Sequence, residues 1–324
     1  MFLETYLNPS FLKKLEIVDL GVFSNSIPES FEKYSTWTNQ NTELSYLTDI
    51  RKENRQNLAN IFPEFKSGAS FLFSYAPTKK FLNQENFHQV SSYTLHFDEA
   101  DYHFVLGKRL KEIGEYLQSH ISGLVFEVCL DTKPILERDF AYQAGLGWFG
   151  KNSMLINRQH GSYFLIGTLL FNQKFSHEEK KPIELDHCGN CRACVEACPT
   201  DAINEAERTI SLKDCLSYYS IEVFKEGEVP PKIKSEFQNE IFGCEICQEV
   251  CPWNEKPLSR INVKIATGKL YSFFSRPLAE VAQRVAAFSN SQYRKFFFGS
   301  SFYRSGKRGL VKNFKNLLFQ KKSD

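Results

Sequence analysis

Eight of the nine cysteines lie between Cys188 and Cys251, and their spacing could bind iron–sulfur clusters. The run that starts at Cys188 has the pattern C-x₂-C-x₂-C-x₃-C-P. In this pattern three thiolates bind one [4Fe–4S] cluster, and the fourth, before the proline, binds a second cluster. A shorter run, C-x₂-C-x₃-C-P, starts at Cys244. The spacing therefore predicts two clusters that transfer single electrons at low potential.

The second run lacks one ligand of a complete ferredoxin repeat. Ile241 stands where that repeat would have a cysteine, and Cys215 is the spare thiol upstream. Two tetrathiolate sites then use all eight cysteines. The predicted ligand sets are Cys188, Cys191, Cys194 and Cys251 for one cluster, and Cys198, Cys215, Cys244 and Cys247 for the other.

Zinc is the main alternative, because C-x₂-C pairs also bind zinc. A zinc site explains neither the two Cys-Pro ends nor the three cysteines spaced at i, i+3 and i+6. A disulfide framework is disfavoured, because such frameworks occur in small domains of oxidising compartments.

Asp131 is the candidate acid outside the cysteine segment. It ends an apolar run that begins at Val125 and precedes a Thr-Lys-Pro turn. A carboxylate at the C-terminal end of a strand lies where α/β sheets usually bind ligands. The residues alone leave a second interpretation open, in which Asp131 caps a helix that starts near Pro134.

The elements that must position these groups form three predicted segments. Residues 1–185 read as an α/β or α+β domain, 186–255 as a ferredoxin-like double-cluster domain, and 256–324 as a helical basic segment. The charged stretch 178–182 is a predicted linker, and the glycine-rich 145–150 should break the helix after Pro134. Strands are predicted over Leu15–Val22, Ser70–Tyr75, Leu124–Asp131, Ser153–Asn157 and Ser162–Phe171, and helices over Leu44–Ala59, Tyr102–Ser119 and Pro277–Ala287.

The composition is that of an ordinary globular protein with more than one domain. The 324 residues are 42% hydrophobic and 24% charged, and most of the 30 phenylalanines are expected in the core. No apolar run reaches the length of a membrane span. The first residues carry no export signal, so a cytoplasmic location without membrane attachment is expected.

Positive charge gathers near the C-terminus. Residues 290–324 carry nine of the 40 Lys and Arg and one of the 38 Asp and Glu, with aromatic residues between the basic ones. A basic, aromatic segment suits a polyanion such as RNA. From charge alone, a solvated helical face is the favoured interpretation.

Several motifs together resemble the epoxyqueuosine reductase family, which performs the last step of queuosine synthesis on transfer RNA. The resemblance extends over most of the chain. The matching residues are Arg55, Asp101-Tyr-His103, Asp131-Thr-x-Pro-x-x-Glu-Arg138, Ala144-Gly-Leu-Gly-Trp-Phe-Gly-Lys-Asn152, Gly161-Ser-Tyr163, Cys215-Leu-Ser-Tyr218 and the two cysteine runs.

The resemblance implies a cobalamin cofactor, two [4Fe–4S] clusters and Asp131 as proton donor. Burial in an apolar cofactor pocket would raise the pKa of a carboxyl group and suit it to that role. Cys129, on the same strand, is expected in the core. The candidate cobalamin contacts by motif position are Arg55, Asp131, Ser153, Leu155, Ile166 and Ser217.

The resemblance also implies partners. The substrate would be tRNA with epoxyqueuosine in the anticodon loop, and a ferredoxin or flavodoxin would supply electrons. Many corrinoid proteins carry the cobalt-ligand motif D-x-H-x-x-G, and residues 101–107 depart from it by one residue, because they read D-x-H-x-x-x-G. No protein histidine is therefore expected as a ligand of cobalt. Longer family members continue into a helical-repeat extension, and the basic tail is expected to contribute to RNA binding here.

Three other functions are considered. A reductive dehalogenase also joins cobalamin to two clusters, but those enzymes generally carry a twin-arginine signal. A plain two-cluster electron-transfer protein would bind no corrinoid, and a tRNA-binding protein with structural clusters would bind RNA without reducing it.

Overall fold

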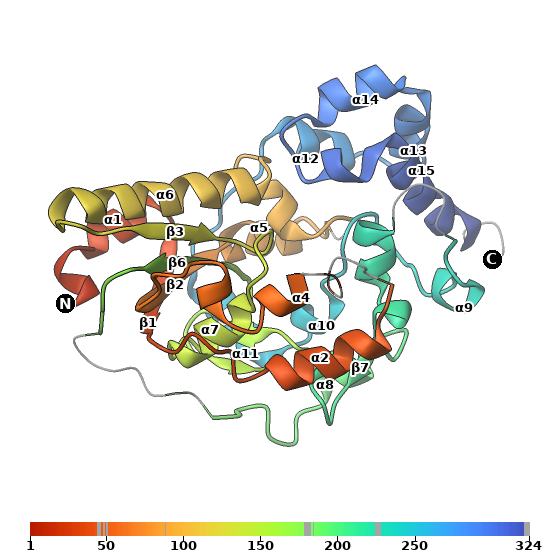
Figure 1. Ribbon diagram of the computed structural model, residues 1–324. Helices are drawn as coiled ribbons and strands as arrows, with labels where there is room; N and C mark the ends of the chain where they lie inside the picture. The colour runs from red at the N-terminus through yellow and green to blue at the C-terminus, as the bar shows by residue number, and fades with distance from the viewer. Residues whose placement is uncertain are drawn as a thin grey trace. The chain divides into compact units, whose positions relative to one another are not determined.

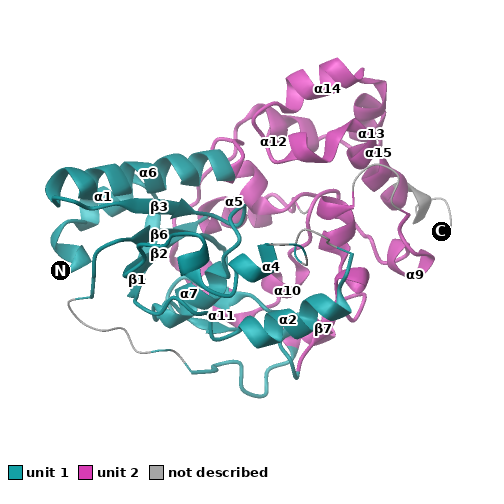
Figure 2. Cartoon of the chain, in the orientation of Figure 1, with its two compact units in different colours: residues 1–74, 103–192, 206–209 teal, residues 75–102, 193–205, 210–324 magenta. Residues whose placement is uncertain are grey.

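The computed structural model describes residues 1–324 except 44–46, 48, 50, 88, 178–182, 184, 224–227 and 321–324. The chain divides into two compact units, shown in Figure 2. Unit 1 comprises residues 1–74, 103–192 and 206–209, and unit 2 comprises 75–102, 193–205 and 210–324. The predicted linker 178–182 lies outside the described residues. The three-segment division made from sequence stays a prediction.

Unit 1 is built on a four-stranded sheet with the order β1-β2-β6-β3. Every neighbouring pair in this sheet is antiparallel, so the unit is of the α+β kind. Every residue of β2 is buried and β6 is largely apolar, as expected of central strands that are covered on both faces. The strands are β1 (Ile17–Phe23), β2 (Ser67–Ser74), β3 (Phe126–Cys129) and β6 (Phe164–Phe171).

Helices cover the two faces of this sheet (Figure 1). Helix α6 (Tyr102–His120) buries Leu106, Leu110, Ile113 and Leu117, which recur at helical spacing. Leu110 fits against Gly167 of β6, where a Cβ atom would lie 2.7 Å from the leucine Cδ1. On the opposite face, helix α7 (Glu137–Gln143) packs with residues of β2 and β6 in one hydrophobic cluster.

The glycine-rich segment forms a tight hairpin. Strands β4 (Trp148–Phe149) and β5 (Leu155–Ile156) pair in antiparallel register. Gly147 precedes β4 with a φ of 148°, and a Cβ atom there would lie 2.1 Å from the Ile156 carbonyl oxygen. Only glycine allows this approach of the two strands.

The helix predicted over Leu44–Ala59 is confirmed in part. The described residues of this range hold α4 (Arg51–Asn54) and the start of the short helix η2 (Leu58–Asn60). Asn57 interrupts them with extended backbone, and its side chain accepts a hydrogen bond from Ala59 N. The other elements of unit 1 are η1 (Leu3–Thr5), α1 (Pro9–Lys14) and α2 (Phe31–Gln40).

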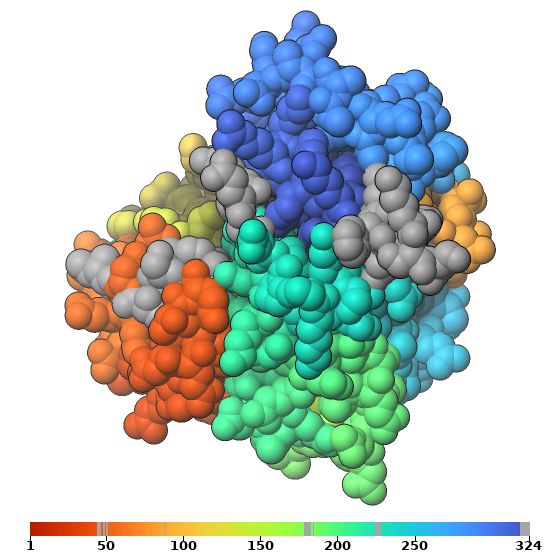
Figure 3. Space-filling view, turned by 90° about the vertical axis from the view of Figure 1, so that its right-hand side faces the viewer, coloured from red at the N-terminus to blue at the C-terminus, as the bar shows by residue number. Residues whose placement is uncertain are grey.

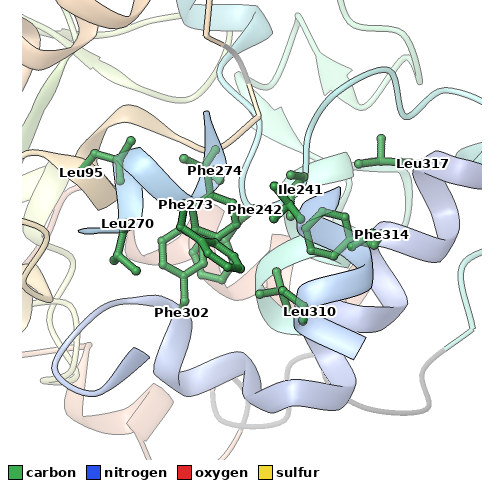
Figure 4. Close-up of a cluster of buried hydrophobic side chains, with 14 of the residues drawn as sticks. Leu95, Ile241, Phe242, Leu270, Phe273, Phe274, Phe302, Leu310, Phe314 and Leu317 are labelled. Atoms are coloured by element: carbon green, nitrogen blue, oxygen red, sulfur yellow. The ribbon is translucent and has the colours of Figure 1, made fainter. Parts of the chain in front are cut away.

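Unit 2 is mainly helical, and its core is aromatic (Figure 4). Phe274, Phe297, Phe302 and Phe314 are all buried, which confirms a core role for these phenylalanines. Helix α13 begins at Leu278 directly after Pro277, as predicted. The elements are α5 (Ala76–Gln84), η3 (Ser92–Leu95), α8 (Ala193–Glu196), β7 (Ile203–Asn204), η4 (Leu212–Asp214), η5 (Tyr218–Glu222), α9 (Pro231–Lys234), α10 (Ile246–Glu249), α11 (Pro252–Arg260), α12 (Lys269–Phe274), α13 (Leu278–Ala287), α14 (Asn290–Phe297) and α15 (Phe302–Gln320). The short strand β8 (Thr209–Ile210) has one residue in each unit.

Within the described ranges, no helix has both the length and the apolar character that crossing a membrane requires.

Candidate active site and cluster-binding segment

Asp131 lies in the turn that follows β3, and it does not cap the next helix. Helix α7 begins at Glu137, and its N-cap residue, Leu136, makes no side-chain capping bond. The turn is held by backbone hydrogen bonds from Lys133 N to Leu130 O and from Ile135 N to Lys133 O, each 2.8 Å long. The capping interpretation of Asp131 is therefore wrong, because the helix starts too late in the sequence.

His103 is the partner of Asp131. Its Nε2 lies 2.8 Å from Asp131 Oδ1, and the two side chains are 24% and 43% exposed. Helix α6 carries His103 in its first turn, and the chain then returns along β3 to bring Asp131 back to the same end. The positive end of the helix and the imidazole both favour a negative carboxylate here.

A second carboxyl group lies beside the first. Burial raises the pKa of Glu137, Arg138 and Arg55 oppose this rise, and the charge of Asp131 adds to it. The two carboxyl groups and two guanidinium groups therefore form one electrostatic cluster within unit 1.

Arg55 is the buried cation of this cluster. The residue is 7% exposed, and its guanidinium carbon lies 5.7 Å from the centre of the Tyr34 ring. Among the described residues, its Nη1 has no hydrogen-bond partner. A buried donor without an acceptor costs free energy, so this atom fits a polar group of a bound molecule.

Three further predicted cofactor contacts also lie in unit 1. Ser153, with a φ of 64°, accepts hydrogen bonds from Arg138 Nη1 on its carbonyl oxygen at 2.5 Å and on its Oγ at 3.4 Å. Leu155 is buried in the hydrophobic cluster beneath the sheet, and Ile166 packs against that cluster. Their contact with cobalamin stays a prediction.

Cys129 is a core residue, as predicted. It is fully buried on β3 within the same hydrophobic cluster. Burial raises the pKa of its thiol to about 12, which keeps the thiol protonated and unreactive at neutral pH.

Unit 2 brings together the four thiols predicted for the second cluster. Burial raises the pKa of Cys244, and the neighbouring Cys247 and Cys215 raise it further. The pKa of Cys215 is also raised by burial, and in addition by Cys198. The described residues contain no group of three or more His, Cys, Asp or Glu that could hold a single metal ion.

Backbone N–H groups point at these sulfur atoms. Ala202 N donates to Cys198 Sγ at 3.3 Å, and Ile246 N donates to Cys244. The N–H groups of Ser217 and Tyr218 donate to Cys215 and oppose the rise of its pKa. Donors of this kind stabilise negative charge on cluster sulfurs, so the donor set fits an iron–sulfur cluster. Ser217, a predicted cobalamin contact, is thus a neighbour of a cluster thiol.

The other four predicted ligands are divided between the units. Cys188 and Cys191 belong to unit 1, and Cys194 and Cys251 belong to unit 2. Their assignment to one cluster stays a prediction. Within unit 2, helices α8 and α10, which carry Cys194 and Cys247, pack against each other.

Ile241 stands where a complete ferredoxin repeat would have a cysteine, and its side chain belongs to the core. It is fully buried in the aromatic cluster of unit 2, where Figure 4 shows it beside Phe242 and Phe314. Its backbone N donates to Gln89 O at 2.6 Å, and Phe242 O accepts from Ser91 N at 2.8 Å. An apolar side chain satisfies this position better than a metal ligand would.

A buried ion network holds the second cysteine run to helix α5. Lys79 Nζ lies 2.9 Å from Glu245 Oε2 and 2.5 Å from Glu249 Oε1. The other oxygen of Glu245 accepts from Ser92 N at 2.9 Å and from Ser92 Oγ at 2.8 Å. Burial alone would lower the pKa of Lys79, but the two glutamates raise it above its ordinary value. Glu245 stands between Cys244 and Cys247, so this network fixes the cysteine loop.

Sequence reasoning missed His103, Glu137 and Lys79 as parts of these sites. His103 and Glu137 stand in the motifs quoted for the family resemblance, which was the available signal. Their contact with Asp131 depends on how α6 and α7 return to the end of β3. Lys79 stands in no motif, and a lysine at its position would ordinarily be assigned to the surface.

Two family models match parts of the chain. Residues 187–254 match the 4Fe-4S double cluster binding domain, and residues 55–132 match the family described as epoxyqueuosine reductase QueG, DUF1730. The chain therefore carries a binding domain for two iron–sulfur clusters.

One similar relative is the epoxyqueuosine reductase of Cyclobacterium marinum, which is 36% identical over 70% of this chain and 71% of its own length. Among solved structures, epoxyqueuosine reductase from Streptococcus thermophilus has a TM-score of 0.78 and is 23% identical, over 96% of this chain and 80% of that one. An epoxyqueuosine reductase bound to an epoxyqueuosine-modified tRNA-Tyr stem loop has a TM-score of 0.73 and is 21% identical, with the same coverage. The structural matches show the fold, and the identity and coverage of the Cyclobacterium enzyme show that the chain belongs to the epoxyqueuosine reductase family of oxidoreductases.

Proposed function

We propose that this enzyme reduces epoxyqueuosine to queuosine at the wobble position of tRNA, with cobalamin reduced through two [4Fe–4S] clusters and Asp131 as the proton donor. The observation that carries the proposal is the Asp131–His103 pair at the end of β3, in a chain that also holds a double-cluster domain. Removing the epoxide oxygen as water requires protons, and this pair is placed to hold one.

Asp131 is accessible enough to act on a bound substrate. Its side chain is 43% exposed, so the protein alone does not desolvate it. A cofactor and a substrate that cover the carboxyl would remove its water and raise its pKa. His103 Nε2 fixes the orientation of Oδ1, and burial raises the pKa of the neighbouring Glu137.

The cofactors supply the electron chemistry. Cobalamin, when bound, supplies a strongly reducing metal centre, and the clusters supply electrons one at a time. Arg55 supports the fit, because its buried Nη1 has no acceptor among the described residues. The cofactor contacts that we propose are Arg55, Asp131, Ser153, Leu155, Ile166 and Ser217, and the cluster ligands are the eight cysteines between Cys188 and Cys251.

The partners follow from the same reaction. The tRNA stem loop bound by the related reductase supports tRNA with epoxyqueuosine in its anticodon loop as the substrate. A base in a loop leaves its stack at modest cost, which suits a buried cofactor site. We also propose a ferredoxin or flavodoxin as electron donor and a cytoplasmic location.

Anaerobic reconstitution tests the proposal. We expect about eight irons per chain, binding of cobalamin, and loss of one oxygen from epoxyqueuosine by mass spectrometry when a low-potential reductant is present. A protein that holds about four irons or fewer, or that does not bind cobalamin, would contradict it. Reducible clusters without oxygen loss would instead favour a plain electron-transfer protein.

A further inference from the structure

Two aromatic side chains are exposed together at the turn between α14 and α15. Phe298 is 74% exposed and Tyr303 is 42% exposed. Their ring centres lie 5.8 Å apart, and the rings are nearly perpendicular, at 85°. Most other aromatic residues of this segment are buried in the core of unit 2, so the exposure of this pair is unusual for the segment.

The turn that carries the pair is held in place on both sides. Helix α14 starts with a capping box between Ser289 and Gln292. Gly299 turns the chain with a φ of 77°, and its carbonyl oxygen accepts from Asp101 N at 2.7 Å. Tyr293 Oη donates to Phe302 O at 2.7 Å. The two exposed rings therefore extend from an ordered backbone, which lowers the entropy lost when a ligand binds.

Basic residues flank the pair in the sequence. Arg294 and Lys295 are exposed on α14, and Arg294 stands one helical turn before Phe298. The sequence has no Asp or Glu between residues 290 and 323. Figure 3, in which colour follows residue number and not charge, shows the segments nearest the C-terminus in blue at the surface.

Two basic residues of the C-terminal segment bind groups within the protein instead. Lys312 Nζ donates to the carbonyl oxygens of Tyr219 and Val223, and burial lowers its pKa to about 8. Arg304 pairs with Glu222 at 2.8 Å. Arg294 and Lys295, by contrast, are exposed on α14.

We propose that Phe298 and Tyr303 form a stacking site for an unpaired RNA base, and that Arg294 and Lys295 contact the adjacent phosphates. Single-stranded RNA is recognised by aromatic rings that stack on its bases and by basic groups along its backbone. The inference rests on the proposed function, in which a tRNA stem loop is the substrate, and it assigns the loop contact to four residues of unit 2.

Binding to two RNA probes separates stacking from charge. The probes are a tRNA anticodon stem loop and a fully paired duplex of equal length, and the protein is the cluster-loaded full chain. We expect Phe298→Leu with Tyr303→Leu to weaken stem-loop binding about tenfold or more and to leave duplex binding unchanged. We expect Arg294→Gln with Lys295→Gln to weaken both and to reduce the salt slope for the stem loop by about 1.4.

Matched controls keep the test specific. Lys256→Gln with Arg260→Gln removes the same charge from exposed positions of α11 in the same unit, and we expect no change in either binding constant beyond about twofold. Retained cluster absorbance shows that each variant is folded. The stacking site is contradicted if the leucine variant binds the stem loop with unchanged affinity. It is also contradicted if this variant loses affinity equally for the stem loop and the duplex.

Reduction of the free epoxyqueuosine nucleoside distinguishes the two proposals. Both proposals hold if wild type and the leucine variant reduce the nucleoside at the same rate and only the variant binds the stem loop more weakly. If wild type does not reduce the nucleoside or the modified stem loop, the proposed function fails, and the binding arm still decides the stacking site.

Discussion

Two ion pairs of nearly equal length differ in their exposure to solvent. His103 and Asp131 in unit 1 are 2.8 Å apart with side chains 24% and 43% exposed, whereas Lys79 and Glu245 in unit 2 are 2.9 Å apart with side chains 3% and 7% exposed. An exposed pair contributes little to stability, because water screens it. Breaking a buried pair leaves an uncompensated charge. Burial therefore separates a pair available for chemistry from one that holds the fold.

The local sequence around each pair agrees with this difference. Glu245 stands between two cluster cysteines and uses both carboxylate oxygens inside the protein, on Lys79 and Ser92. Asp131 follows a strand end, and its side chain remains accessible. We expect mutations of the buried pair to act on stability and cluster retention, and mutations of the exposed pair to act on catalysis.

Lys79→Met should have the largest effect on the fold. It leaves Glu245 buried without its cation, and we expect the free energy of unfolding of the cluster-loaded protein to fall by about 3–5 kcal/mol. Denaturant unfolding under anaerobic conditions measures this. The control is Lys14→Met, which breaks an exposed pair with Glu112 and should cost less than about 1 kcal/mol. Equal losses from the two variants would remove the distinction between the pairs.

His103→Gln should act on turnover instead. Glutamine can hydrogen-bond Asp131 but cannot hold the same geometry or charge, so we expect kcat to fall about 10–100-fold with KM nearly unchanged. Stability should change by less than about 1 kcal/mol. A variant that unfolds readily while retaining its turnover per folded molecule would show that the pair is structural.

Glu137→Gln should change how stability depends on pH. Burial raises the folded pKa of Glu137 above its ordinary value near 4.5, so the folded state binds this proton more tightly than the unfolded state does. The resulting stabilisation is complete below the unfolded pKa and is lost as the pH rises through the folded pKa. Wild type should therefore lose stability relative to the variant across this window, by at most about 1.4 kcal/mol per pH unit. Parallel curves of unfolding free energy against pH would contradict the raised pKa.

Much of the cluster segment could be predicted from sequence, because ligand spacing is a local property. The spacing of the cysteines and the position of Cys215 predict a second ligand set whose four members all belong to unit 2, and their role as cluster ligands stays a prediction. Ile241 could be identified as a missing ligand, but its place in the aromatic core depends on the pairing of residues 89–91 with 241–242.

Other parts of the site depend on tertiary contacts that the sequence pattern does not contain. The turn after β3 delays α7 to Glu137, so Asp131 meets His103 instead of capping a helix. Lys312 carries the same charge as its neighbours in the tail, yet backbone carbonyl oxygens bind it within unit 2. Asn57, with extended backbone, separates α4 from η2, where the sequence pattern predicts one helix.

Single-turnover reduction by Asp131→Asn tests the proposed proton donor most directly. The cluster-loaded, cobalamin-bound variant would be mixed with epoxyqueuosine stem loop and reductant, and product followed by mass spectrometry. Glu115→Gln, which removes an exposed carboxyl from α6, is the matched control. We expect the control to release one oxygen at the wild-type rate, and Asp131→Asn to slow this at least about 100-fold with the cobalamin spectrum retained. Wild-type turnover by Asp131→Asn would contradict the proposal that Asp131 supplies the proton.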